Sequence, residues 1–236
     1  MVRKVICALD TGNLAEAESL VRRLSPYVGA FKIGHALTLP HGLDVIDRLQ
    51  DAGATRIFLD LKFHDIPNSV ALAVREAAKH RVWMTTIHVA GGPAMIQAAA
   101  DEANAYGEEN APLLMGVCVL TSLDQNVLTE FLGVNRTIQD HLVKLGKSAL
   151  DAGIDGLISS PQEVKALRMN IGHRGIIVAP GIRPEGASSH DQIRVGTASQ
   201  AFDDGADYVV IGRALTDTPD VEAALVNLGF NLAAAG

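Results

Sequence analysis

Residues 56–69, RIFLDLKFHDIPNS, begin like a buried strand and end like a charged loop. Apolar and polar side chains alternate through the first half, as the two-residue repeat of a β-strand requires. Asp60 and Lys62 share one face of this strand, so it directs a carboxylate and an ammonium group to the same side. Asp65 comes after the strand, close to Pro67, and is expected on a loop. The stretch therefore predicts a buried strand that delivers charges to a site at its carboxyl end.

Short apolar segments of this kind recur along the whole chain, with stretches of helical periodicity between them. The first such helix is expected from Asn13, which can cap it, to Leu24. Alternation of eight strands with helices predicts an α/β fold of the (β/α)8 TIM-barrel type, formed by residues 1–236 as a single domain. The expected strands are VICALD (5–10), AFKIG (30–34), RIFLDLK (56–62), MTTIHVA (84–90), LLMGVCVLT (113–121), GLISS (156–160), GIIVAPG (175–181) and YVVIGR (208–213).

Three of these strands follow similar lead-ins. DAGATRI (51–57), DAGIDGL (151–157) and DDGADYV (203–209) each indicate a helix end, a glycine stop and a strand start. The structural alternative is a doubly wound open sheet. Two observations disfavour it: the first turn, DTGNLAE (10–16), lacks a GxGxxG fingerprint, and polar residues gather at the carboxyl ends of many strands, where a barrel has its active site.

Composition narrows the class of protein. With 236 residues and 48% hydrophobic residues, the chain can bury a large core. No apolar run approaches the roughly 20 residues of a membrane span, and no signal peptide is evident. The two cysteines, Cys7 and Cys118, are expected to be buried reduced thiols of a cytoplasmic protein. A net charge of −7 without a long basic run argues against nucleic-acid binding, although a few local cations suffice for a small anion.

The charged residues of the first three strands form one constellation. Lys32 alternates with apolar neighbours in AFKIG, and Asp10 ends VICALD on the inward side. Together with Asp60 and Lys62 they are expected at one mouth of the barrel. An ion network that merely plugs the barrel is the alternative, but desolvating four charges without a use for them is costly. We therefore expect proton or carbanion chemistry on a small molecule, with Lys62 as a proton donor.

Other catalytic chemistries have weaker support. The histidines show neither HxH nor HExxH spacing, so no metal site is predicted. His64 and His88 lie near strand ends, and a structural hydrogen bond is the expected role of each. No serine has the context of a nucleophile elbow, and neither a Rossmann nor a P-loop motif is present.

The end of the eighth strand suggests a phosphate site. VVIGRALTDTPD (209–220) places Gly212 and Arg213 where barrels often bind phosphate, and a guanidinium group can pair with phosphate oxygens. The long polar loop after strand seven, PGIRPEGASSHDQIRVGT (180–197), carries Arg183 and Gln192. A loop of this length at the active face is expected to close over a ligand.

These motifs together resemble the orotidine 5'-phosphate decarboxylase family. DLKFHDIPNS (60–69) is similar to the family signature, and FKIG, IHVAGG, GVCVLTS, APGIRP and VIGRAL resemble its other blocks in the expected order. The resemblance covers essentially the whole chain and is of the bacterial, single-function type. A bare DxKxxD is shared with sugar-phosphate enzymes of the same superfamily, whereas the HDIPN continuation and APGIRP separate this chain from them. Two positions depart from the family pattern: Ser69 replaces the usual Thr, and Cys118 stands where related chains often carry Thr.

The resemblance implies cofactor-free decarboxylation of orotidine 5'-phosphate to UMP in pyrimidine biosynthesis, by a homodimer. It implies that Lys62 protonates C6 of the pyrimidine, that Asp60 lies beside the departing carboxylate, and that Asp65 is supplied by the other subunit. The substrate-binding residues that it implies are Asp10, Lys32, Asp60, Lys62, Asp65, Ile66, Ser69, Thr121, Ser122, Arg183, Gln192, Gly212 and Arg213, with Lys32, Asp60, Lys62 and Asp65 also catalytic. The alternatives are a metal-dependent sugar-phosphate decarboxylase or aldolase of the same superfamily, and a non-catalytic phosphate-binding barrel.

Overall fold

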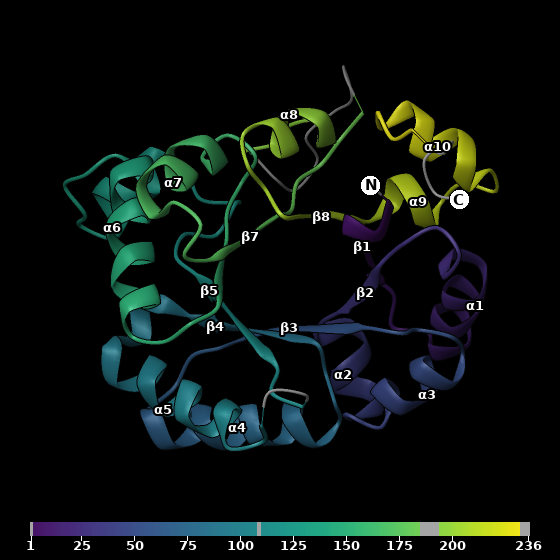
Figure 1. Ribbon diagram of the computed structural model, residues 1–236, viewed down its shortest axis with the longest axis horizontal. Coiled ribbons are helices and arrows are strands. Elements are labelled where there is room, and N and C mark those ends of the chain that lie inside the picture. The colour runs from purple at the N-terminus through teal and green to yellow at the C-terminus, as the bar shows by residue number, and fades with distance from the viewer. Residues whose placement is uncertain (1, 108–109, 185–193, 232–236) are drawn as a thin grey trace.

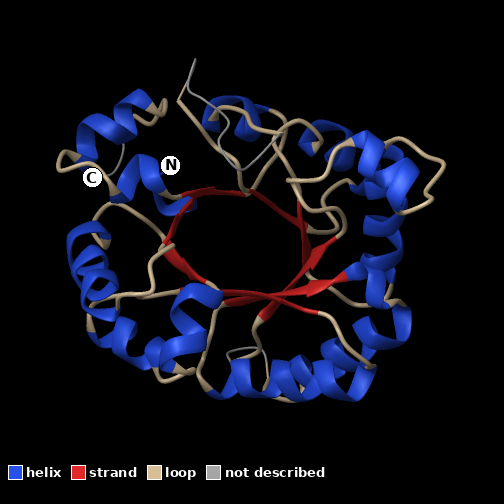
Figure 2. Ribbon diagram, turned by 180° about the vertical axis from the view of Figure 1, so that it is seen from behind, coloured by secondary structure: helices blue, strands red, loops and turns tan. Residues whose placement is uncertain are grey.

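Eight parallel β-strands in the described part of the chain form a closed barrel in which each strand pairs with the next and the eighth pairs with the first. The computed structural model describes residues 2–107, 110–184 and 194–231. Helices surround this closed ring of strands (Figures 1 and 2). Within the described residues the strands are β1 (Val5–Ala8), β2 (Ala30–Ile33), β3 (Ile57–Phe63), β4 (Met84–His88), β5 (Leu113–Val117), β6 (Gly156–Ile158), β7 (Ile176–Ala179) and β8 (Tyr208–Ile211). Each lies inside a segment expected from the sequence or extends it by one residue, so the predicted (β/α)8 barrel is confirmed.

The helices follow the strands around the outside of the barrel. Their bounds are α1 (Leu14–Leu24), α2 (His35–His41), α3 (Val45–Asp51), α4 (Pro67–Lys79), α5 (Pro93–Asn104), α6 (Ile138–Asp151), α7 (Val164–Ile171), α8 (Ala198–Asp203), α9 (Arg213–Thr216) and α10 (Val221–Asn227). Short turns of 3-10 helix, η1 (Val2–Lys4) and η2 (Val89–Gly91), and a π-helical turn, η3 (Val127–Phe131), complete the set in the described residues. No helix in those ranges is long and apolar enough to cross a membrane.

Local signals in the sequence explain where several helices begin and end. The Asn13 side chain accepts a hydrogen bond from the Glu16 backbone N–H, which is the predicted cap of α1. In the three similar lead-ins, Gly53, Gly153 and Gly205 have φ angles of 113°, 105° and 104°. Other residues adopt this region only with strain. The three glycines therefore end α3, α6 and α8 in the same way and turn the chain into the next strand.

Strand alternation divides the core into two parts. Side chains that point outward pack against the helices, among them Cys7, Phe31 and Leu59. Side chains that point inward fill the barrel, among them Ile6 and Phe58. The inward positions nearest the carboxyl ends of β2 and β3 carry Lys32 and Asp60 instead of apolar groups. The barrel interior is thus filled by apolar side chains, and the charged site lies at the carboxyl ends of the strands.

Both cysteines are buried and unpaired. Burial raises the pKa of each thiol to about 12, with Asp10 adding to the effect at Cys7. Neither thiol is therefore ionised near neutral pH, and both behave as small apolar side chains.

Candidate active site

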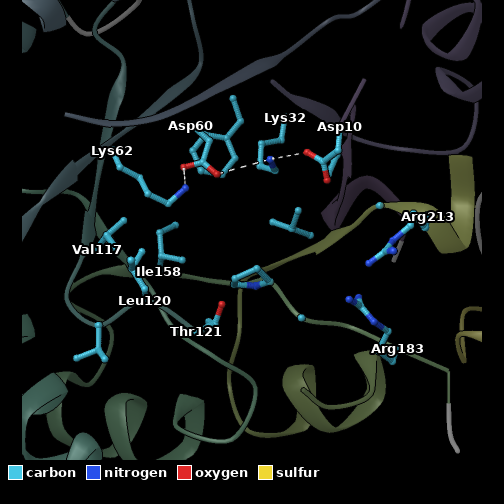
Figure 3. Close-up of a pocket in the computed structure, with 17 residues that line it drawn as sticks. Asp10, Lys32, Asp60, Lys62, Val117, Leu120, Thr121, Ile158, Arg183 and Arg213 are labelled. Atoms are coloured by element: carbon cyan, nitrogen blue, oxygen red, sulfur yellow. Dashed lines mark hydrogen bonds and ion pairs between the residues drawn. The ribbon is translucent and has the colours of Figure 1, made fainter. Parts of the chain in front are cut away.

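A cavity of about 280 Å³ opens at the carboxyl ends of the strands (Figure 3). This volume lies near the lower end of the range for small-molecule sites. Its described lining consists of Ala8, Asp10, Lys32, Phe58, Asp60, Lys62, Val117, Val119, Leu120, Thr121, Ile158, Pro180, Gly181, Arg183, Val210, Gly212 and Arg213. Eight of the site residues expected from the sequence therefore line the same cavity.

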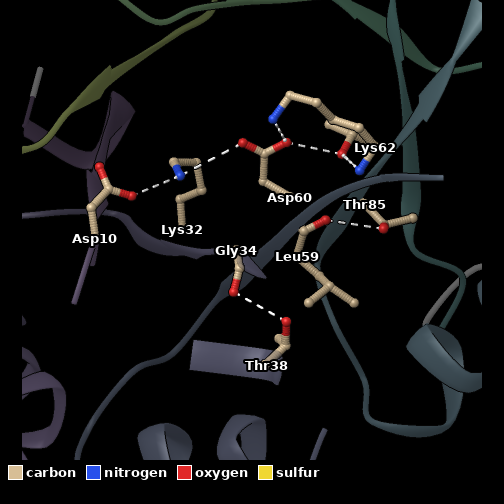
Figure 4. A network of polar contacts seen from close by, with 9 residues as sticks. Asp10, Lys32, Gly34, Thr38, Leu59, Asp60, Lys62 and Thr85 are labelled. Carbon is tan, nitrogen blue, oxygen red and sulfur yellow. Dashed lines mark hydrogen bonds and ion pairs between the residues drawn. The ribbon is translucent and has the colours of Figure 1, made fainter. Parts of the chain in front are cut away.

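The charges along one wall form a continuous row (Figure 4). Lys32 Nζ lies 3.3 Å from Asp10 Oδ1 and 3.6 Å from Asp60 Oδ2, and Lys62 Nζ lies 2.8 Å from Asp60 Oδ1. The Asp60 and Lys32 side chains are each only 14% exposed, whereas that of Asp10 is 70% exposed. The central carboxylate is therefore shielded from water and held between two ammonium groups.

Asp60 keeps its charge despite this burial. Burial by itself raises the pKa of the carboxyl group, but the ammonium groups of Lys32 and Lys62 and the hydrogen bonds from Lys62 and Thr86 outweigh it. The net result is a pKa below the ordinary value for aspartate. A buried, ionised carboxylate therefore lies beside the Lys62 amine.

The two-residue alternation of β3 explains why the Asp60 side chain points into the barrel, but it explains the direction of the Lys62 side chain only in part. Leu59 and Leu61 pack toward the helices, as expected. Lys62, however, has a φ angle of 51°, and the pairing of β3 with β4 shifts between Leu59 and Phe63. The regular pairing of β3 with β4 thus breaks after Leu59, and the bulge that follows directs the Lys62 side chain into the cavity.

The far end of the cavity carries two guanidinium groups. Figure 3 shows Arg183 and Arg213 on the side of the cavity opposite Lys62, with their guanidinium groups directed toward one another, whereas Val117, Leu120 and Ile158 lie on the side of Lys62. Gly212 caps the short helix α9 beside Asp10. The cavity therefore has one end that combines apolar side chains with the Lys62 amine and a cationic end that suits a phosphate.

The loop that carries Arg183 is closed at its base. The Arg183 backbone N–H donates to the Gly196 carbonyl at 2.9 Å, and the Gly196 N–H donates to the Gly181 carbonyl at 3.2 Å. Arg194 forms a buried ion pair with Glu163 at 2.9 Å and donates to the Leu120 carbonyl at 2.9 Å. These contacts fix both ends of the loop, residues 181–183 and 194–196, to each other and to the rest of the site. Gln192 lies outside the described residues.

Four expected residues are not among the described residues that line the cavity: Asp65, Ile66, Ser69 and Ser122. Asp65 is exposed, and its Oδ1 accepts a hydrogen bond from the N–H of Ile66 at 2.6 Å. The Ile66 side chain is 66% exposed. Ser69 lies in the first turn of α4, and Ser122 is exposed. These residues belong to the surface beside the cavity rather than to its wall.

His64 and His88 lie ring to ring, with centroids 5.2 Å apart. Burial, His64 and Lys62 lower the pKa of His88, so its imidazole is neutral at neutral pH. Within residues 2–107, 110–184 and 194–231, no three His, Cys, Asp or Glu side chains are arranged to hold a metal ion.

One polar residue at the site was not found from the sequence. Thr86 is fully buried on β4, and its hydroxyl group contacts both Asp60 and Lys62. Alternation from Met84 to His88 places residue 86 on the inward face. The sequence therefore did contain a signal for Thr86: a polar residue at an inward position on the strand next to the one that carries Asp60 and Lys62.

Fold and site together define a TIM barrel with a row of charges at one end of its cavity and two guanidinium groups at the other. Comparison with known proteins is more specific. The profile described as "Orotidine 5'-phosphate decarboxylase / HUMPS family" matches residues 3–227, and the chain belongs to this family.

Individual relatives agree with this assignment. The orotidine 5'-phosphate decarboxylase of Moorella thermoacetica is 44% identical over 225 residues, which cover 94% of this chain and 88% of the relative. That of Glaesserella parasuis is 42% identical over 233 residues, covering 99% of this chain and 100% of the relative. The crystal structure of the decarboxylase from Lactobacillus acidophilus superimposes with a TM-score of 0.82 at 35% identity, covering 95% and 96% of the two chains.

Proposed function

We propose that this chain is a cofactor-free enzyme that decarboxylates orotidine 5'-phosphate to UMP in pyrimidine biosynthesis, with residues 1–236 acting as one catalytic domain. One observation carries the proposal. A buried carboxylate, Asp60, lies between two ammonium groups at one end of a cavity whose other end holds two guanidinium groups. Relatives 41–44% identical over nearly the full length are named as this decarboxylase.

The polarity of the cavity matches the parts of a nucleotide. We assign the pyrimidine to the end beside Lys62, where Val117 and Ile158 supply apolar surface and Thr121 supplies a hydroxyl group. Asp10 and Lys32, at the end of the charged row away from Lys62, are suited to bind the ribose hydroxyls. The phosphate then reaches Arg183, Gly212 and Arg213, with Gln192 as a further contact that the resemblance implies. The resemblance also implies that Ser122 lies by the base, next to Thr121.

The charges in the site explain how loss of CO₂ would be accelerated. A substrate carboxylate beside Asp60 is repelled, and this repulsion is relieved in the transition state as CO₂ leaves. The C6–carboxylate bond breaks, its electron pair stays on C6, and the Lys62 ammonium delivers a proton there. Water then reprotonates the neutral amine. General acid catalysis supplies only roughly 10²–10⁴ of the rate, so fixed charges and remote phosphate binding must supply the remainder.

A homodimer completes the site in this proposal. Asp65 lies off the cavity of its own chain, on a loop followed by the exposed apolar side chain of Ile66. In a two-fold dimer each subunit presents the same loop to its partner. We propose that Asp65, Ile66 and Ser69 contribute to the partner's cavity, with Asp65 near the partner's charged row. A cytoplasmic location agrees with the two buried, unpaired thiols.

The loss of orotidine 5'-phosphate, followed by ultraviolet absorbance with and without a chelator, tests this function. We expect stoichiometric formation of UMP at the same rate in both conditions. A requirement for a divalent metal would favour the sugar-phosphate branch of the superfamily. Binding of the nucleotide without turnover would favour a non-catalytic barrel.

A further inference from the structure

The hydroxyl group of Thr86 lies at the centre of the charged wall. Thr86 is 0% exposed on the inward face of β4. Its Oγ1 donates to Asp60 Oδ1 at 3.0 Å and accepts from the backbone N–H of Lys62 at 2.9 Å. Because Lys62 Nζ also contacts Asp60 Oδ1, at 2.8 Å, the three residues form a closed ring of hydrogen bonds.

The backbone of Lys62 needs this support. Leu59 pairs with Thr85 and Phe63 with Ile87, so three residues of β3 lie opposite one residue of β4, Thr86. Lys62, at a φ angle of 51°, lies in the left-handed region, which residues with a side chain adopt only with strain. Its N–H points out of the regular ladder and finds its acceptor in the Thr86 hydroxyl.

We propose that Thr86 is a positioning residue, which sets the Lys62 ammonium and the Asp60 carboxylate at their working separation through one hydroxyl group. A hydroxyl has one proton to donate and lone pairs to accept with. Its proton goes to Asp60, and a lone pair receives the Lys62 N–H. Valine at this position would keep the shape but leave both groups without this partner. The inference rests on the proposed decarboxylation for its kinetic test, although not for its spectroscopic one.

The chain provides a matched control next to this residue. Thr85 is also fully buried on β4, but its hydroxyl faces outward and donates to the Leu59 carbonyl at 3.0 Å (Figure 4). Thr85→Val therefore removes a buried hydroxyl from the same strand without touching the charged row. Thr86→Ser keeps the hydroxyl and removes only a methyl group.

The kinetic test compares Thr86→Val, Thr86→Ser and Thr85→Val with orotidine 5'-phosphate. The lost hydrogen bond to a charged group lies at the reacting end, so kcat of Thr86→Val should fall roughly 10- to 100-fold. KM should stay within about threefold, since the phosphate contacts are intact. Thr86→Ser should recover most of kcat, and Thr85→Val should lose at most about threefold. A Thr86→Val enzyme with wild-type kcat, or one whose loss is matched by Thr85→Val at equal melting temperature, would overturn the inference.

A second readout does not depend on turnover. Removing a donor from the Asp60 carboxylate raises its pKa, so its carboxyl carbon should titrate at higher pH in Thr86→Val than in the wild type or Thr85→Val. This shift is measured by ¹³C NMR, with the resonance assigned from Asp60→Asn. An unchanged titration would refute the positioning role even if the wild type proved inactive. If Thr86→Val does not fold, Thr86→Ala against Thr86→Ser makes the same comparison.

Discussion

Lys32→Met removes one of the two ammonium groups that keep the buried Asp60 ionised. The Lys32–Asp60 pair is 3.6 Å apart, and both side chains are 14% exposed. At an effective dielectric constant near 20, two unit charges at this distance attract by about 5 kcal/mol. Removing one partner of a buried pair costs about 3–5 kcal/mol in practice. If that stabilisation acts on the transition state, kcat/KM should fall by about 10²–10⁴-fold.

The variant should also change the pH dependence. In the wild type the Asp60 pKa is lowered, so this group stabilises the fold above the unfolded carboxyl pKa and loses that contribution as the pH falls through its folded pKa. Without Lys32 the folded pKa rises. The acidic limb of kcat/KM should therefore move to higher pH, and the gain in stability of the protein between acidic and neutral pH should shrink.

The assay is the initial rate of orotidine 5'-phosphate loss from about pH 3 to pH 8, with urea unfolding at the same pH values, because the carboxyl groups concerned titrate in the acidic part of this range. Lys79→Met is the control. The Lys79–Glu76 pair is shorter, at 2.7 Å, but its side chains are 52% and 49% exposed. Water screens such a pair, so its loss should leave both profiles unchanged. A Lys32→Met enzyme within tenfold of the wild type, with an unmoved acidic limb, would refute the claim that burial gives this charge its effect.

Further outcomes are expected from the same geometry. Lys62→Ala should lower kcat by several orders of magnitude while the melting curve persists; near-normal turnover would remove Lys62 from the proton step. Arg213→Ala should lower kcat/KM strongly for orotidine 5'-phosphate but hardly for orotidine, and equal losses for both would separate Arg213 from the phosphate. In an exchanged mixture of Lys62→Ala and Asp65→Ala subunits, about a quarter of the sites should recover activity, whereas verified exchange without recovery would place Asp65 in its own site. Arg168→Met should lower the free energy of unfolding by about 2–4 kcal/mol without changing kcat. The Arg168 side chain lies away from the cavity and donates hydrogen bonds to Asp207 and to the carbonyls of Gly172, Gly175 and Gly205. An unchanged urea midpoint would contradict this expectation.

The fold could be predicted because its signals are local and repeated. The two-residue alternation in each strand and the glycine that ends α3, α6 and α8 are properties of short segments. The same alternation placed Lys32 and Asp60 at the mouth, since a regular strand needs no tertiary information to fix the direction of its side chains.

Features that depend on contacts between strands were harder to predict. The left-handed Lys62 arises from a mismatch between β3 and β4, which neither strand shows by itself. Thr86 was missed because its importance lies in its partners on β3 and not in its own segment. Whether Asp65 acts in its own chain or, as proposed, in a partner depends on contacts between chains, which the alternation within one strand does not determine.

The most direct test of the central claim is decarboxylation of carboxyl-¹³C orotidine 5'-phosphate in D₂O with a chelator present. The products are followed by NMR for the wild type and Lys62→Met. The wild type should release one ¹³CO₂ for each UMP formed, with one deuterium at C6, and Lys62→Met should leave the substrate intact over the same time. Unchanged substrate with the wild type, or full turnover with Lys62→Met, would contradict the account.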